Sequence, residues 1–119
     1  MFKELEKHFG VLKLPVGHVV YRQGDKDQDG YVLVKGRVEL SRKFSGEMIE
    51  RGVFITEGQV FGVFTALFGT ESRRWNAITV EPSEIIMIPA QTLMTKIDAM
   101  DPFLKYCLSQ WYSLEHSKK

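Results

Sequence analysis

The chain has 119 residues, enough for one domain with a single hydrophobic core and too few for two. Its 16 basic and 15 acidic side chains give a formal net charge of +1, without the basic excess typical of nucleic-acid binders. No run approaches the roughly 20 apolar residues that a membrane-spanning helix needs, and the single cysteine excludes an intrachain disulfide. We therefore expect a single-domain cytoplasmic protein without a membrane partner.

The predicted elements begin with a short amphipathic helix over residues 1–9, because Phe2, Leu5 and Phe9 recur at helical spacing before Gly10. From about residue 12 to 90 the pattern changes to short strands separated by glycines. Residues 19–21, 31–40, 49–55, 77–80 and 85–88 are rich in β-branched and aromatic side chains, and Ser45-Gly46 predicts a hairpin turn. This pattern favours a mainly β roll, barrel or sandwich with flanking helices.

The tail predicts a second helix over about 102–117, with Asp101 as N-cap and Pro102 at the first helical position. Its apolar residues share one stripe: Leu104, Cys107, Leu108, Trp111 and Leu114. Within this stripe Cys107 is expected to be a buried small hydrophobe rather than a reactive thiol. The stripe can pack on its own domain or on a second copy, and the sequence leaves both open.

A candidate binding site follows the predicted strand that ends at Phe61. Gly62 lets a ligand approach the backbone closely, since no Cβ stands in the way. The short apolar turn after it offers backbone amides without intrahelical partners, and the arginine pair Arg73-Arg74 adds a planar fork that suits phosphate oxygens. These parts predict a cradle for a small anionic ligand.

The order of these motifs resembles that of cyclic nucleotide-binding domains, as in bacterial catabolite activator proteins and kinase regulatory subunits. The resemblance is carried by PVGHVVYRQGD at residues 15–25, YVLVKGRV at 31–38, GQVFG at 58–62 and RRW at 73–75, in register with EIIMI at 84–88. It covers nearly the whole chain from about Leu12 onward.

The resemblance implies a β-roll of the double-stranded β-helix or jelly-roll type, and a non-enzymatic sensor that binds cAMP or cGMP. Arg73 would pair with the cyclic phosphate, or Arg74 if the register slips by one, and Ile55 would line the base pocket. The remaining implied ligand residues form the cassette: Gly62, Val63, Phe64, Thr65, Ala66 and Trp75. No further cofactor is implied, and the output would pass to a downstream protein or to a homodimer formed through the C-terminal helix.

Two residues depart from the family pattern. Val63 stands where the family uses a glutamate to hold the ribose 2′-hydroxyl, and a buried hydroxyl left unpaired costs about 1–3 kcal/mol. Trp75 stands where the family has a small residue, so its ring could either stack on a ligand or fill the pocket. Both departures support a second hypothesis, a degenerate domain that binds no nucleotide and serves protein–protein contact.

Other chemistries are less well supported. Asp25, Asp27 and Asp29 match the start of an EF-hand calcium loop, but position twelve is Gly36, and a polar turn explains the same residues. The three histidines lack metal-ligand spacing, and no nucleophile motif is present, so an enzyme is not expected. No helix-turn-helix follows the tail helix, so binding of nucleic acid is not expected either.

Overall fold

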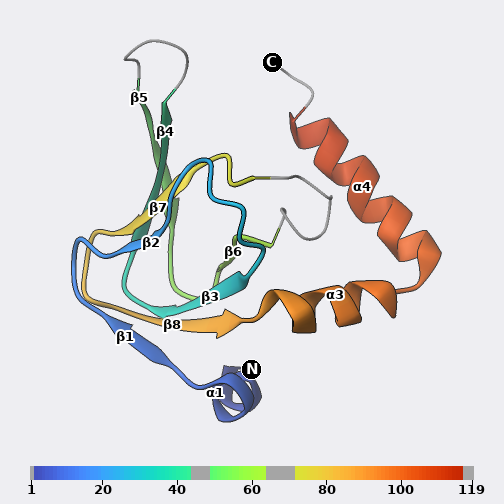
Figure 1. Ribbon diagram of the computed structural model, residues 1–119, viewed down its shortest axis with the longest axis horizontal. Coiled ribbons are helices and arrows are strands. Elements are labelled where there is room, and N and C mark those ends of the chain that lie inside the picture. The colour runs from blue at the N-terminus through green and yellow to red at the C-terminus, as the bar shows by residue number, and fades with distance from the viewer. Residues whose placement is uncertain (1, 44–48, 64–71, 117–119) are drawn as a thin grey trace.

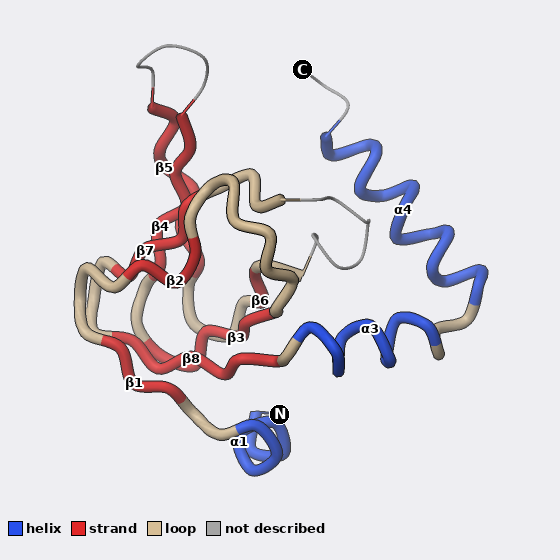
Figure 2. Tube along the Cα trace, viewed as in Figure 1, coloured by secondary structure: helices blue, strands red, loops and turns tan. Residues whose placement is uncertain are grey.

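The computed structural model describes residues 2–43, 49–63 and 72–116. In that part of the chain, eight strands form two four-stranded antiparallel sheets, ordered β1-β8-β3-β6 and β2-β7-β4-β5 (Figure 1). The strands are β1 Leu12–Leu14, β2 Val19–Tyr21, β3 Gly30–Lys35, β4 Val38–Lys43, β5 Ile49–Ile55, β6 Val60–Phe61, β7 Asn76–Thr79 and β8 Ser83–Ile88. The helices are α1 Phe2–Phe9, α3 Ala90–Asp98 and α4 Pro102–His116, which lie outside the sheets (Figure 2).

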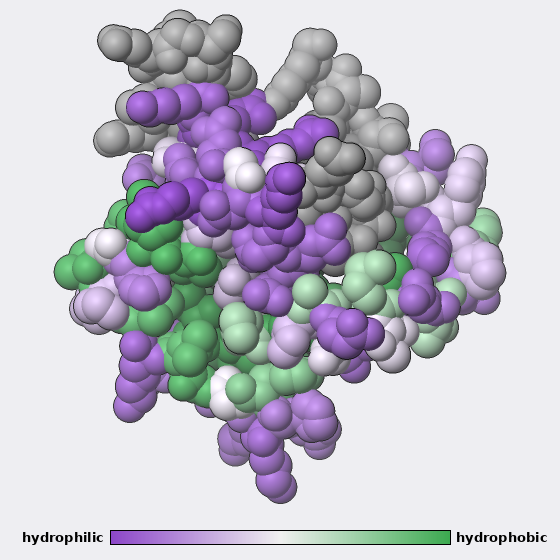
Figure 3. Space-filling view, in the orientation of Figure 1, coloured by the Kyte–Doolittle hydropathy of each residue, from purple (hydrophilic) through white to green (hydrophobic). Residues whose placement is uncertain are grey.

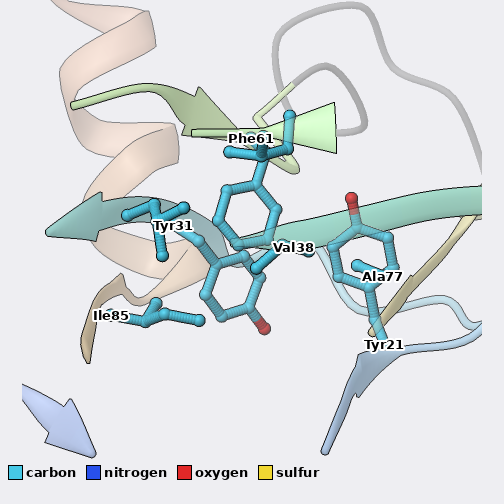
Figure 4. Packing of buried hydrophobic residues seen from close by; sticks show 8 residues of the cluster. Tyr21, Tyr31, Val38, Phe61, Ala77 and Ile85 are labelled. Carbon is cyan, nitrogen blue, oxygen red and sulfur yellow. The ribbon is translucent and has the colours of Figure 1, made fainter. Parts of the chain in front are cut away.

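The main core lies between the two sheets. Strand β3 alternates, sending Tyr31 and Leu33 inward and Val32 to the opposite face, as the pleat requires. Inward residues of both sheets make one cluster, in which the Tyr31 and Phe61 rings stack at 5.2 Å between centroids (Figure 4). The cluster contains Tyr21, Tyr31, Leu33, Val38, Ile55, Phe61, Ala77 and Ile85. The chain is therefore a mainly β domain closed around one apolar interior.

A second apolar layer covers the outer face of the β1-β8-β3-β6 sheet. Buried Val32, Ile86 and Ile88 are packed against the apolar stripe of α1 and against Leu93 of α3. Helix α1 ends at Gly10, whose φ of 78° suits glycine and whose N–H donates to the Glu6 carbonyl at 2.7 Å. Residues of α1 and α3 thus cover buried apolar side chains on the outer face of this sheet.

Three parts of the fold differ from the sequence-based predictions. The predicted strand 31–40 is split at Gly36, which has a φ of 103° and lies where an added Cβ would be 2.7 Å from the Pro82 carbonyl oxygen. Helix α3 and strand β1 were not predicted at all. The antiparallel pairing of β4 with β5 agrees with the predicted hairpin, although Ser45 and Gly46 lie outside the described residues.

Helix α4 begins where the sequence predicts it, since Asp101 Oδ1 accepts from the Phe103 and Leu104 amides at 2.8 and 3.3 Å. Its first turns are not buried by the domain: Phe103 is 70% exposed and Leu104 56%. Cys107 is also exposed, so its predicted burial was wrong. Figure 1 shows α4 beyond the end of α3, on the outside of the molecule. Among the described helices, none has the length and apolar character to cross a membrane.

Candidate functional site

The candidate site lies where the end of β6 meets the segment entering β7. The backbone of Arg73 is fixed there by the β2–β3 connection: its N–H donates to the Asp25 carbonyl at 2.7 Å, and its carbonyl accepts from the Gly24 amide at 2.8 Å. Figure 3 shows hydrophilic side chains over this connection. Residues Asp25–Gly30, called the acidic loop below, are thereby brought beside the predicted cassette.

The Arg73 side chain turns into the protein rather than toward solvent. Only 3% of the residue is exposed, and its guanidinium forms a two-bond ion pair with Asp27, with Nε–Oδ1 3.2 Å and Nη2–Oδ2 2.6 Å apart. Nη2 also donates to the Asp29 carbonyl at 2.6 Å, and Nη1 donates to the Gly62 carbonyl. The arginine predicted to hold a phosphate is therefore already held by an internal carboxylate and two backbone carbonyls.

Two tyrosines enclose the same guanidinium. The Arg73 Cζ lies 4.2 Å from the Tyr21 ring centroid and 5.9 Å from that of Tyr31, within cation–π range. Burial raises the pKa of Tyr21 to about 12, although the Arg73 charge acts to lower it. Burial, helped by the charge of Asp27, also raises the pKa of Tyr31 to about 12. Both phenols thus stay protonated near neutral pH and give the arginine an aromatic lining.

Gly62 is required for this arrangement. Its φ is 81°, and a Cβ on it would lie 3.0 Å from Arg73 Nη1 and 3.0 Å from Tyr31 Cδ2. The sequence predicts that Gly62 admits a ligand close to the backbone. In the structure, the groups that approach Gly62 closely are the guanidinium of Arg73 and the ring of Tyr31.

The acidic loop does not gather its carboxylates around one point. Asp25 Oδ2 accepts from the Arg22 amide at 2.9 Å, Asp27 pairs with Arg73, and Asp29 Oδ1 accepts from the Ala90 amide at 2.8 Å. Among the described residues, no group of three His, Cys, Asp or Glu side chains could hold a metal ion. The EF-hand-like pattern is thus explained by three separate hydrogen-bonding roles.

Val63, which replaces the glutamate of the family pattern, lies beside helix α3. A Cβ on Gly30 would be 2.8 Å from Val63 Cγ1 and 2.9 Å from Leu93 Cδ1, so both side chains lie close to Gly30. The apolar group at position 63 and Leu93 of α3 therefore both border the start of β3.

Trp75 is half-buried at the entry to β7, with the Arg42 Cζ 4.4 Å from its ring centroid. Arg42 is 9% exposed, and sequence analysis did not identify it. A signal was available, because Arg42 continues the inward alternation of Val38 and Leu40 along β4. The ring predicted to stack on a ligand or fill the pocket thus has an arginine against one of its faces.

The other predicted site residues are more scattered. Arg74 is exposed, and Ile55 belongs to the buried core cluster. Phe64, Thr65 and Ala66 lie outside the described residues. A separate surface groove of about 370 Å³ contains none of the predicted site residues; it is lined by Lys13, Leu14, Pro15, Lys35, Pro82, Ser83 and Glu84.

Comparison with known proteins identifies the family and the fold. The sequence is 36% identical over 100 residues to the global nitrogen regulator of Synechococcus elongatus, a match that covers 76% of this chain and 43% of the regulator. The chain spans less than half the length of the curated relatives it matches. The fold is similar to the cAMP-bound form of the EAL enzyme Bd1971, with a TM-score of 0.78 and 15% identity, covering 90% of this chain and 28% of that one.

The fold is also similar to the catabolite activator protein of Thermus thermophilus, with a TM-score of 0.74 and 22% identity, covering 94% of this chain and 52% of that protein. The sequence model of the cyclic nucleotide-binding domain matches residues 11–99, which include both sheets, the acidic loop, Arg73 and helix α3. The resemblance stated from the motifs is confirmed: this chain belongs to the cyclic nucleotide-binding domain family.

Proposed function

We propose that this domain is a non-enzymatic sensor that binds a cyclic nucleotide of the cAMP or cGMP class beside Arg73. Its output would pass through α3 and α4 to a partner protein or to a second copy of the chain. The phosphate would pair with the Arg73 guanidinium, and backbone amides of the cassette after Gly62 would supply further donors. The ligand class is suggested by family membership, and the single observation that carries the site is the placement of Arg73.

That placement is unusual for a surface-loop arginine. Arg73 is only 3% exposed, and its guanidinium lies against Gly62 and two tyrosine rings. These surroundings exclude water and so strengthen the attraction of the guanidinium for an anion. Removing such a charge from water is costly unless an anion compensates it. The buried arginine therefore needs one anionic partner at this position, a place that Asp27 takes in this structure.

A physical connection from this site to the helices supports the proposed output. Asp29 accepts from Arg73 through its carbonyl and from the first amide of α3 through its carboxylate. That amide belongs to the helix start, where the backbone N–H groups lack intrahelical partners. A ligand that shifts the Arg73 side chain on pairing with it would disturb the anchor of α3, and α3 leads directly into α4.

A second candidate function is a domain that binds no nucleotide and serves protein contact. Val63 favours it, because this apolar side chain, which lies close to Gly30, offers no acceptor for a ribose hydroxyl. The internal pairing of Arg73 with Asp27 also favours it, since the fold already satisfies the arginine without a ligand.

Thermal unfolding with and without millimolar cAMP, cGMP or a cyclic dinucleotide distinguishes the two functions. At about 100 times its dissociation constant, a ligand adds roughly 2.7 kcal/mol to the free energy of unfolding. The expected result is a midpoint raised by several degrees in the unmodified chain. Arg73→Lys keeps the charge but loses the planar fork, so the nucleotide-dependent rise should shrink in this variant.

Arg37→Lys serves as the matched control, because Arg37 is an exposed arginine of the roll that pairs with Glu81, with Nε and Oε2 3.9 Å apart. It should respond to nucleotide as the unmodified chain does. A rise abolished only by Arg74→Lys would move the phosphate role to Arg74. The absence of a rise with every nucleotide would favour the protein-contact function.

A further inference from the structure

The ion pair between Arg73 and Asp27 has a consequence for ligand affinity. We propose that Asp27 is an intramolecular competitor for the anion-binding edge of Arg73, so that a ligand anion must displace the Asp27 carboxylate before it can bind. This inference rests on the proposed function, because it takes Arg73 to be the partner of the ligand anion. It assigns Asp27 a role in setting affinity that the calcium-like sequence pattern does not suggest.

The contact geometry identifies which edge of the guanidinium is contested. Asp27 spans the Nε–Nη2 edge with two oxygens, at 3.2 and 2.6 Å. A phosphate presents two oxygens to the same fork in the same way, so the two anions compete for one edge. The other named acceptors are the carbonyls of Asp29 and Gly62, which belong to the backbone and are not interchangeable with a ligand.

Exposure indicates the direction from which a ligand would arrive. The Arg73 side chain is 2% exposed, whereas the Asp27 side chain is 33% exposed. Tyr21 and Tyr31 lie against the guanidinium as well. Of the two members of the ion pair, Asp27 is therefore the one that solvent and a dissolved anion can reach.

The exchange is physically reasonable because one anion replaces another. Arg73 keeps a compensating negative charge throughout, which avoids the large cost of leaving a buried cation unpaired. Asp27 lies in a connection outside the strands and helices, so its carboxylate can turn toward water without breaking a strand pairing. With such competition, the apparent affinity equals the intrinsic affinity multiplied by the fraction of molecules in which Arg73 is not paired with Asp27.

The test is isothermal titration of cAMP and of cGMP into the unmodified chain, Asp27→Asn and Asp98→Asn. Asp27→Asn keeps the shape of the side chain and one acceptor oxygen but removes the competing charge, so nucleotide affinity should rise about tenfold or more. Asp98→Asn makes the same substitution at an exposed position at the end of α3 and should leave affinity unchanged.

The outcomes separate this inference from the function on which it rests. If the unmodified chain binds nucleotide and Asp27→Asn binds it equally or more weakly, Asp27 orients Arg73 and the competitor role is overturned. If neither protein binds either nucleotide, the proposed function fails and the inference fails with it. Binding measurable only in Asp27→Asn would support both.

A measurement on the unmodified chain guards against misfolding of the variant. The side-chain carboxyl carbon resonance of Asp27 should move on saturation with nucleotide, because the carboxylate leaves the guanidinium for water. A carboxyl resonance that stays unchanged while nucleotide binds overturns the proposal independently of any substitution.

Discussion

The β-roll buries apolar side chains between its sheets, whereas helix α4 leaves apolar side chains exposed. Leu33, on β3, is completely buried between the sheets, whereas Leu104, in the first turns of α4, is 56% exposed. The roll buries a connected set of apolar side chains between its two sheets. Helix α4 leaves Phe103, Leu104 and Tyr106 substantially in water, so the domain alone does not account for its apolar character.

This difference separates the roll, which defines the fold, from helix α4, which can change its position at a smaller free-energy cost. A segment with few buried contacts opens or repositions at a smaller free-energy cost than a packed sheet does. Helix α4 is therefore suited to exchange one packing surface for another, and the roll is suited to hold the site at fixed geometry.

The sharpest test of the comparison is Leu33→Ala. Removing a fully buried leucine side chain leaves a cavity that the two sheets cannot fully close, so the free energy of unfolding should fall by about 2–5 kcal/mol. Urea denaturation measures the loss. A fall below about 1 kcal/mol would show that the interior of the roll is less tightly packed than the structure indicates.

Alkaline pH tests the same interior through the buried phenols of Tyr21 and Tyr31. Their pKa values of about 12 exceed the ordinary 10.0, so the stability they support is fully present below pH 10 and is lost as the pH rises toward 12. At about pH 11 the loss should be about 1.4 kcal/mol for Tyr21 and smaller for Tyr31, whose phenol is less deeply buried. Denaturant titrations across this range measure it.

Tyr21→Phe is the control for the pH experiment, since phenylalanine keeps the ring and has no proton to lose. The pH-dependent loss should fall by at least half in this variant, because Tyr21 is the more deeply buried of the two phenols. An identical pH dependence in both proteins would mean that Tyr21 is not the group that titrates.

The smallest expected effect is that of Leu104→Ala, the counterpart of Leu33→Ala on α4. Because the side chain is more than half exposed, the free energy of unfolding should change by no more than about 0.5 kcal/mol. Urea denaturation at low protein concentration measures it. A loss comparable to that of Leu33→Ala would contradict the distinction between roll and helix.

Much of the roll was predictable because its signals are local. Alternating β-branched and aromatic residues identified most strands, and Asp101-Pro102 identified the start of α4. Helix α3 was missed although Pro89 precedes it and Leu93 and Ile97 recur at helical spacing. Its first amide is satisfied by Asp29, 61 residues earlier in the chain, and no local pattern reveals such a partner.

The sequence predicted residues of the candidate site, but it did not predict which of them pair with each other. Sequence analysis identified Gly62, Arg73 and the aspartates of the acidic loop, but assigned the arginine to a ligand and the aspartates to a turn or a cation. Asp27 and Arg73 are 46 positions apart, so only the fold brings them together. Sequence motifs named the charged groups, while the three-dimensional structure determined which of them neutralise each other.

The contact between Arg42 and Trp75 gives the protein an optical probe of its own. The chain has two tryptophans, so replacing Trp111 by phenylalanine leaves Trp75 as the only indole. The guanidinium of Arg42 lies over one face of the Trp75 ring. Trp75 also follows directly after Arg73 and Arg74 in the chain. Because indole emission depends on nearby charge, a movement of Arg42 or of Arg73 and Arg74 relative to Trp75 can be followed by fluorescence without attaching a dye.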